Sequence, residues 1–200
     1  MDFLSDIDVL DKINVDDLWI IDKFILSKKL GYNCGPAGTL PPSPGKYIIR
    51  PIINLRMMSS GAKFIWLDKE DIIPDGYFWC EIFQGRHKSF DYNWGKQCLA
   101  VEGFRNDPER LDRFNLWTKI EEEFILPDFL QEVANRYEWI NIESIDDNII
   151  EVHFRYNDDF ANHSFNSIIP IWKDQFYDNS CGDRIGFLLK DHEKNTNNNR

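Results

Sequence analysis

Residues 139–155 read WINIESIDDNIIEVHFR, two apolar-rich segments on either side of the polar triplet Asp146-Asp147-Asn148. Isoleucine, valine and aromatic residues are typical of strands, and Asp and Asn are typical of tight turns. A three-residue turn in which Asn148 adopts a left-handed conformation fixes the register of such a hairpin. The stretch therefore predicts two antiparallel strands, Trp139–Ile145 and Ile149–Phe154.

The predicted register brings two carboxylates together on one face of the hairpin. Glu143 faces Glu151, and Asn141 faces His153, while the alternate positions are apolar and belong to the core. Like charges directly opposite each other repel, and a bound cation such as Mg²⁺ is a common reason for keeping them. The alternative is a solvated outer face, because a slip of one residue would separate the two carboxylates.

The remaining pattern predicts an α+β fold with mostly antiparallel sheets and a few helices. We expect a single domain over residues 1–194, with two sublobes at about 1–80 and 81–194, and a disordered tail at 195–200. Helices are predicted at Asn14–Leu30 and from Pro127 to Tyr137, further strands at Lys46–Leu55, Ala62–Leu67, Tyr77–Phe83, Lys88–Tyr92, Gln97–Phe104, Ser167–Trp172 and Arg184–Leu189, and connecting segments at Gly35–Gly45 and Arg56–Gly61.

The charge balance excludes some classes of function. The 200 residues include 23 basic and 34 acidic ones, a formal net charge of −11, whereas nucleic-acid binders usually carry a basic surface. No apolar run reaches the roughly 18 residues of a membrane span, and the acidic N-terminus does not resemble a signal peptide. The four scattered cysteines form no Cys-x-x-Cys pair. We expect a soluble cytoplasmic protein that binds neither nucleic acid nor membrane.

Several segments, in order along the chain, resemble the motifs of one known superfamily. They are Asp22-Lys23, Lys28-Lys29-Leu30-Gly31-Tyr32, Leu40-Pro41-Pro42, Tyr47-Ile48-Ile49-Arg50-Pro51, Phe78-Trp79-Cys80-Glu81-Ile82-Phe83-Gln84-Gly85-Arg86 and Ile150-Glu151-Val152-His153-Phe154-Arg155. In this order they resemble the ATP-grasp superfamily, the fold of many ATP-dependent carboxylate–amine ligases. More faintly, the chain resembles uncharacterised proteins of large tailed phages, which would place it in the cytoplasm of the host.

The resemblance implies an ATP-grasp-like fold that binds ATP with Mg²⁺. It also implies roles for single residues. Magnesium would be bound by Glu143, Glu151 and His153, the phosphates by Lys23 and Arg50, and the nucleoside by the segment with Glu81 and Phe83, and Arg155 would contact phosphate or substrate. Two of these have equally simple alternatives, because Lys23 on an amphipathic helix and Glu81 on an aromatic strand could both be solvated side chains.

The implied reaction is ligation of a small-molecule or peptide carboxylate to an amine through an acyl phosphate. Such a phosphoryl transfer needs cations that neutralise the phosphate oxygens and hold the reactants in line. The loop Arg56–Gly61 would cover the phosphates and exclude water.

The chain departs from the family pattern at three points. Arg50 stands where the family has lysine, which keeps the charge, and His153 stands where it has asparagine, which offers Mg²⁺ a nitrogen instead of an oxygen. We also expect the family's separate N-terminal domain to be absent, because barely 13 residues precede the first predicted helix. The alternative function is therefore a degenerate, non-catalytic binding or accessory protein, virus-encoded and directed at a protein partner. A third hypothesis is an iron site built from His87, His153 and His163 with Asp91 or Asp159.

Overall fold

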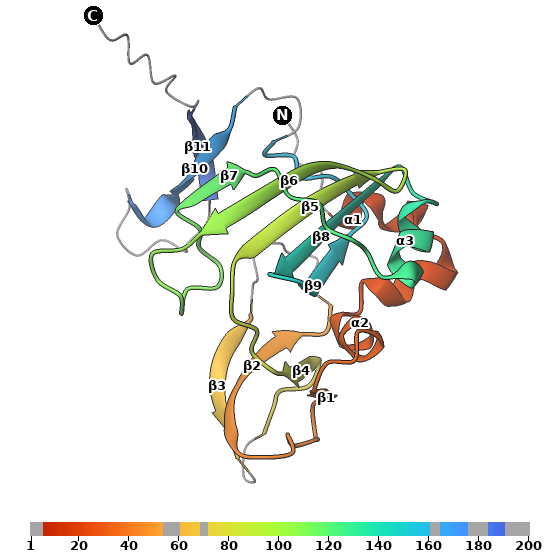
Figure 1. Ribbon diagram of the computed structural model, residues 1–200. Helices are drawn as coiled ribbons and strands as arrows, with labels where there is room; N and C mark the ends of the chain where they lie inside the picture. The colour runs from red at the N-terminus through yellow and green to blue at the C-terminus, as the bar shows by residue number, and fades with distance from the viewer. Residues whose placement is uncertain (1–5, 54–60, 69–71, 161–164, 176–183, 191–200) are drawn as a thin grey trace, which may run out of the picture.

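The computed structural model describes residues 6–53, 61–68, 72–160, 165–175 and 184–190. Two antiparallel sheets, one above the other in Figure 1, make up most of it, with short helices along one side. The predicted α+β fold with mostly antiparallel sheets is confirmed. The predicted loop at residues 56–60 and the predicted tail at 195–200 lie outside the described residues.

The smaller sheet has four strands in the order β1-β4-β2-β3, which are β1 (Cys34–Pro36), β4 (Tyr77–Cys80), β2 (Gly45–Pro51) and β3 (Lys63–Leu67). The sequence did not predict β1, because it lies at the start of the Gly- and Pro-rich segment. Pro36 fits there because β1 is an edge strand, where the missing N–H group of proline costs no ladder hydrogen bond.

The larger sheet has seven strands in the order β11-β10-β7-β6-β5-β8-β9. They are β5 (His87–Asn93), β6 (Lys96–Phe104), β7 (Leu116–Lys119), β8 (Trp139–Ile145), β9 (Asn148–His153), β10 (Ser167–Trp172) and β11 (Arg184–Lys190). Of these, β7 was not predicted. All strands of the smaller sheet precede residue 81, and all those of the larger sheet follow it. The predicted division into two sublobes at about residue 80 stays a prediction.

The helices are α1 (Asp6–Val9), α2 (Lys23–Lys29), α3 (Asp128–Ala134) and the 3₁₀ helices η1 (Leu10–Lys12), η2 (Val15–Ile20) and η3 (Lys173–Gln175). The single helix predicted for Asn14–Leu30 is thus two helices. A new helix, α2, begins after Asp22, whose carboxylate accepts a hydrogen bond from the Ile25 N–H at 2.8 Å and caps the helix. Gly31 follows the C-terminal cap of α2, with a φ of 81° that favours glycine. No helix among the described residues is long and apolar enough to span a membrane.

The main core lies between one face of the larger sheet and the helices η2 and α3. It is built from side chains such as Phe90, Ile142 and Val152 of the sheet and Leu130 and Val133 of α3. Because side chains alternate along a strand, the opposite face carries the polar positions of β5, β8 and β9. Near the smaller sheet, this polar face borders the space between the two sheets.

The β8–β9 hairpin keeps the predicted pairing where the carboxylates lie. Glu143 pairs with Glu151 and Asn141 with His153, as expected. Nearer the turn the prediction was wrong by one residue, because Ser144 pairs with Ile149 and the register shifts between Glu143 and Ser144. The residue with positive φ is Asp146, at 45°, and not Asn148. The bulge leaves Ile150 without a partner in the ladder.

Candidate functional site

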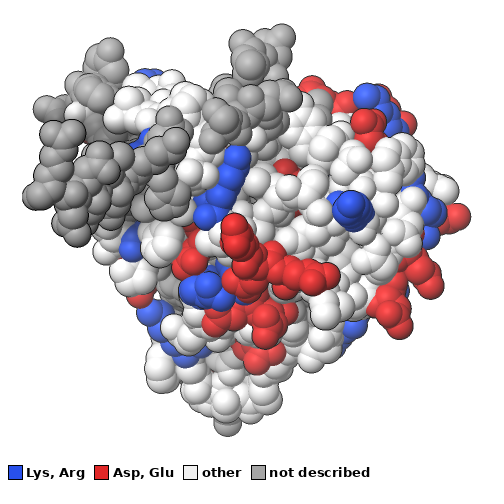
Figure 2. Space-filling view, turned by 45° about the horizontal axis from the view of Figure 1, so that its top comes forward, with Lys and Arg blue, Asp and Glu red and all other residues white. Residues whose placement is uncertain are grey.

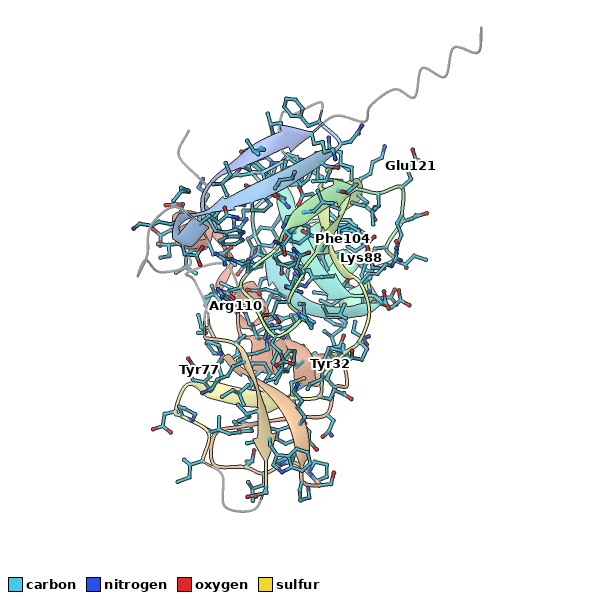
Figure 3. All side chains as sticks on the ribbon, turned by 90° about the vertical axis from the view of Figure 1, so that its left-hand side faces the viewer. Tyr32, Tyr77, Lys88, Phe104, Arg110 and Glu121 are labelled. Atoms are coloured by element: carbon cyan, nitrogen blue, oxygen red, sulfur yellow. The ribbon has the colours of Figure 1, made fainter. Side chains whose placement is uncertain are left out.

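A cleft lies where the two sheets meet, and the space between its walls, including the part open to solvent, is about 700 Å³. Its polar walls carry Lys23 of α2, Arg50 of β2, Glu81 after β4, and Glu151 of β9. In Figure 3, the labels of Tyr32 and Arg110 mark the level at which the smaller sheet meets the larger one. Five of the predicted site residues, Lys23, Arg50, Glu81, Phe83 and Glu151, thus line one cleft, although they come from segments far apart in the sequence.

Lys23 is a buried cation that contacts one of the two facing carboxylates. Its Nζ lies 2.6 Å from Oε1 of Glu151, and the residue is 5% exposed. The backbone N–H of Lys23 donates to the carbonyl of Ile52 at 2.9 Å, which fixes the start of α2 against the end of β2. The interpretation of Lys23 as a solvated side chain is therefore wrong.

His153 lies among three carboxylates. Its Nδ1 is 2.9 Å from Oδ2 of Asp6, and its Nε2 is 3.7 Å from Oε1 of Glu143 and 3.7 Å from Oε1 of Glu151. A neutral imidazole has only one N–H, so both nitrogens can face carboxylates favourably only when the ring is protonated. Burial lowers the pKa of His153, but Glu151, Asp6 and Glu143 together raise it to about 9. His153 is therefore an imidazolium at neutral pH.

His87 supports the other carboxylate as a neutral ring. Burial outweighs its contact with Glu143 and lowers the pKa of His87 below its ordinary value. Nδ1 lies 3.2 Å from Nη2 of Arg105, which can only donate, so Nδ1 accepts and Nε2 carries the proton. Nε2 then donates to Oε2 of Glu143 at 3.2 Å. Burial raises the pKa of Glu143, but His153 and His87 together hold it well below its ordinary value.

Arg50 is a buried guanidinium that donates a hydrogen bond to a backbone carbonyl. Its Nη2 donates to the carbonyl oxygen of Ile150 at 2.5 Å, the residue that the β-bulge leaves outside the ladder. Its guanidinium carbon lies 5.8 Å from the centre of the Phe78 ring. No carboxylate of the described residues lies within 4 Å of the Arg50 nitrogens. The bulge thus holds a cation in the cleft without neutralising it.

Arg105 is a second guanidinium in the cleft, and it was not predicted from the sequence. It donates to the carbonyl of Leu111 at 3.1 Å, and its guanidinium stacks 3.7 Å from the centre of the Phe114 ring. Its buried Nε has no hydrogen-bond partner among the described residues. Burial lowers the pKa of Arg105 to about 10, although Glu143 and Asp112 oppose the shift. Arg105 directly follows β6, and nothing in its local sequence distinguishes it.

Arg155, predicted to contact phosphate or substrate, is turned toward the N-terminal segment. Its Nε lies 3.1 Å from Oδ1 of Asp6 in α1, and its Nη1 donates to the carbonyl of Tyr156 at 3.3 Å. Burial raises the pKa of Asp6, but His153 and Arg155 together lower it below its ordinary value. Asp6 thus joins two cations, His153 at the end of β9 and Arg155 two residues beyond it, to α1. The role of Asp6 was not predicted from the sequence.

We expect Asp6→Ala to destabilise the fold strongly, because it leaves His153 and Arg155 buried with less countercharge. Removing one partner of a buried ion pair costs about 3–5 kcal/mol. Urea unfolding followed by circular dichroism measures the change. Asp11→Ala, which removes an exposed acidic residue from η1, is the matched control and should change stability little. Equal unfolding midpoints for the two variants would contradict the expected role of Asp6.

The segment after β4 forms another wall of the cleft, with Glu81, Ile82 and Phe83. Oε1 of Glu81 accepts a hydrogen bond from the N–H of Asn33, the residue before β1, at 2.8 Å, which fixes the position of this carboxylate. Phe83 packs edge-on against Tyr32, with ring centres 4.6 Å apart. Both residues line the cleft, and their predicted contact with a nucleoside stays a prediction.

The predicted magnesium ligands meet, but the donor set does not fit a hard divalent cation. Lys23 already contacts Glu151, and the His153 imidazolium offers N–H groups where a metal needs lone pairs. Among the described residues, no group of three or more His, Cys, Asp or Glu side chains is arranged to hold a metal ion. The same observation counts against an iron site built from His87 and His153 with Asp91 or Asp159. His163, the third histidine of that hypothesis, lies outside the described residues.

The surface around the two sheets is mixed in charge. On the face shown in Figure 2, acidic side chains gather in one patch with Lys and Arg side chains beside and around it. The cleft differs from this surface, because Arg50 and Arg105 have no acidic partner within 4 Å in the described part of the chain. An anionic ligand is what such a cleft can bind.

No protein-family model matches the sequence, and no curated protein matches it. Solved structures do match. An ATP-grasp superfamily protein from Archaeoglobus fulgidus aligns with a TM-score of 0.54 and 16% identity, over 86% of this chain and 64% of that one. L-amino acid ligase from Bacillus licheniformis aligns with a TM-score of 0.46 and 11% identity, over 76% of this chain and 44% of that one. D-alanine–D-alanine ligase from Bacillus anthracis, complexed with ATP, aligns with a TM-score of 0.39 and 18% identity, over 68% of this chain and 53% of that one.

The first alignment carries the conclusion on the fold. The chain spans less than two thirds of that protein's length, and at 16% identity the match speaks for the fold alone. The arrangement of two antiparallel sheets with a cleft between them therefore gives this chain an ATP-grasp-like fold.

Proposed function

We propose that the protein binds ATP in the cleft between its two sheets. The observation that carries this proposal is the pair of guanidinium groups, Arg50 and Arg105, that line the cleft and have no carboxylate within 4 Å among the described residues. Phosphate oxygens are suitable partners, because arginine can bind them through two parallel hydrogen bonds. The ATP-grasp-like fold supports a nucleotide over other anions.

The nucleoside would lie at the other wall of the cleft. Glu81 and Phe83 line it there, together with apolar residues such as Ile48 and Ile82. An apolar slot with a few polar groups is typical of small-molecule sites. We propose that the base packs against this wall and that the phosphates extend toward Arg50 and Arg105.

We propose that the bound ATP serves to activate a carboxylate for attack by an amine. The terminal phosphoryl group would pass to the carboxylate, which gives an acyl phosphate and ADP, and the amine would then displace phosphate. Arg50 and Arg105 would stabilise the charge on the transferred group in place of solvent. The substrates would be a small-molecule or peptide carboxylate and an amine.

A second candidate is a non-catalytic ATP-binding protein with the same fold. In this proposal the protein is encoded by a virus and acts on a protein partner. The specific observation in its favour is that Glu143 and Glu151 are already engaged by His87, His153 and Lys23. Phosphoryl transfer normally requires metal ions on the phosphates, and these contacts take up the acidic residues that would hold them.

An assay of ADP release separates the two candidates once binding is established. The protein is incubated with ATP and mixtures of amino acids, and ADP is measured together with calorimetric titration of ATP. We expect one ATP site per chain. ADP release that depends on an added amine would support the ligase, and ATP binding without ADP release would support the non-catalytic protein. Absence of ATP binding by the folded protein would contradict both.

A further inference from the structure

The two facing carboxylates of the hairpin lie within a cluster of charged side chains. This cluster, here called the acid–base cluster, consists of Asp6, Glu143, Glu151, Lys23, His153 and Arg155. We propose that Lys23 and His153 take the place of a divalent metal at the Glu143–Glu151 pair, so that the cleft binds its nucleotide without Mg²⁺.

The contacts of the two cations support this assignment. Lys23 Nζ lies at ion-pair distance from Glu151, 2.6 Å, and the residue is buried. His153 Nε2 lies 3.7 Å from an oxygen of each carboxylate, between the two, where a shared metal ion would have to bind. The other ring nitrogen is held by Asp6 at 2.9 Å, so the ring cannot turn away without breaking that contact. Each carboxylate therefore has a cation of the protein as its partner.

The charge count points the same way. Asp6, Glu143 and Glu151 supply three negative charges, and Lys23, His153 and Arg155 supply three positive ones, so the acid–base cluster is neutral as it stands. A divalent ion would add two positive charges to a largely buried and already balanced group. That is unfavourable unless protein cations leave, since uncompensated buried charge is costly. Nitrogen is also a poor ligand for Mg²⁺.

The phosphates would instead be neutralised by Arg50 and Arg105, which lie outside the acid–base cluster and have no acidic partner within 4 Å among the described residues. This part of the inference rests on the proposed function, because it concerns bound nucleotide. The lack of affinity of the Glu143–Glu151 pair for a divalent cation does not rest on the proposed function, because it concerns the protein without nucleotide.

The first experiment tests the empty protein. Mn²⁺ is titrated into the nucleotide-free wild type, and free Mn²⁺ is followed by electron paramagnetic resonance. We expect no binding below millimolar concentrations. His153→Asn, which removes the imidazolium and supplies an amide oxygen, should bind Mn²⁺ at least about tenfold more tightly than the wild type. Lys23→Met, which keeps the apolar stem and removes the charge, should also gain affinity, and circular dichroism checks the folding of both variants.

The second experiment tests the cleft. ATP is titrated calorimetrically into the wild type in excess EDTA and again in excess Mg²⁺, and we expect affinities within about threefold of each other. Micromolar Mn²⁺ binding by the wild type, or an ATP affinity that rises more than about tenfold with Mg²⁺, would overturn the inference. If ATP fails to bind in both conditions, the proposed function is wrong, and the Mn²⁺ titration still decides whether protein cations replace the metal.

Discussion

Replacing either guanidinium of the cleft should weaken ATP binding by one to two orders of magnitude. Arg50→Ala and Arg105→Ala each remove a cation that has no acidic partner within 4 Å among the described residues, and a hydrogen bond to a charged group contributes about 1.5–3 kcal/mol. That range corresponds to losses of roughly 10- to 150-fold in affinity. Calorimetric titration of ATP into each variant measures the change.

The effect of each variant on ATP binding must be separated from its effect on folding. Arg50 holds the carbonyl of Ile150 and Arg105 stacks on Phe114, so each alanine variant can lose stability as well as affinity. Lysine at either position keeps the charge but not the two-pronged geometry, and we expect it to restore part of the affinity. Lys96→Ala removes an exposed positive charge from the first residue of β6 and is the control. If Lys96→Ala weakens ATP binding as much as Arg50→Ala does, the phosphates do not lie at Arg50.

Stability should fall as the pH rises from 6.5 to 9, because of His153. In the folded protein the carboxylates around it raise the pKa of His153 to about 9, whereas an unfolded histidine has a pKa near 6.5. Below pH 6.5 both states are protonated, and the ion pairs contribute in full. Above pH 6.5 the unfolded state loses its proton first, so the contribution disappears as the pH approaches 9. The expected loss is roughly 2–3 kcal/mol.

Urea unfolding of wild type and His153→Gln across this pH range measures the effect. Glutamine keeps a side-chain N–H donor but cannot gain a proton, so the variant should show a flatter pH dependence between 6.5 and 9. The difference between the two curves removes the contributions of other titrating groups. Parallel curves for wild type and variant would mean that His153 is not an imidazolium in the folded protein.

The hairpin shows why part of the site could be predicted. A tight turn between two short strands fixes their register, and the alternation of side chains then places Glu143, Glu151 and His153 on one face. The structure has this pairing, even though the turn itself is one residue shorter than predicted. The bulge that corrects for the shorter turn is a backbone feature without a side-chain signal, so Ile150 as the acceptor for Arg50 could not be predicted.

Other parts of the site depend on contacts between distant segments. Asp6 meets His153 across 147 positions of the sequence, and the four residues of α1 show no pattern that would predict this contact. Arg105 enters the cleft because β6 ends beside β5, which brings it to His87. In the same way, β1 and β7 are short strands whose partners decide their conformation. Local propensity is a weak guide in such segments.

The most direct test of ATP binding in the cleft is a crystal structure of the protein grown with a non-hydrolysable ATP analogue and without divalent cations. We predict density for the analogue between the two sheets, with its phosphates in contact with Arg50 and Arg105 and its base beside Phe83. We also predict that Lys23 and His153 keep their contacts with Glu151 and Glu143. An analogue bound elsewhere on the protein, or a cleft that stays empty at saturating analogue, would contradict this account.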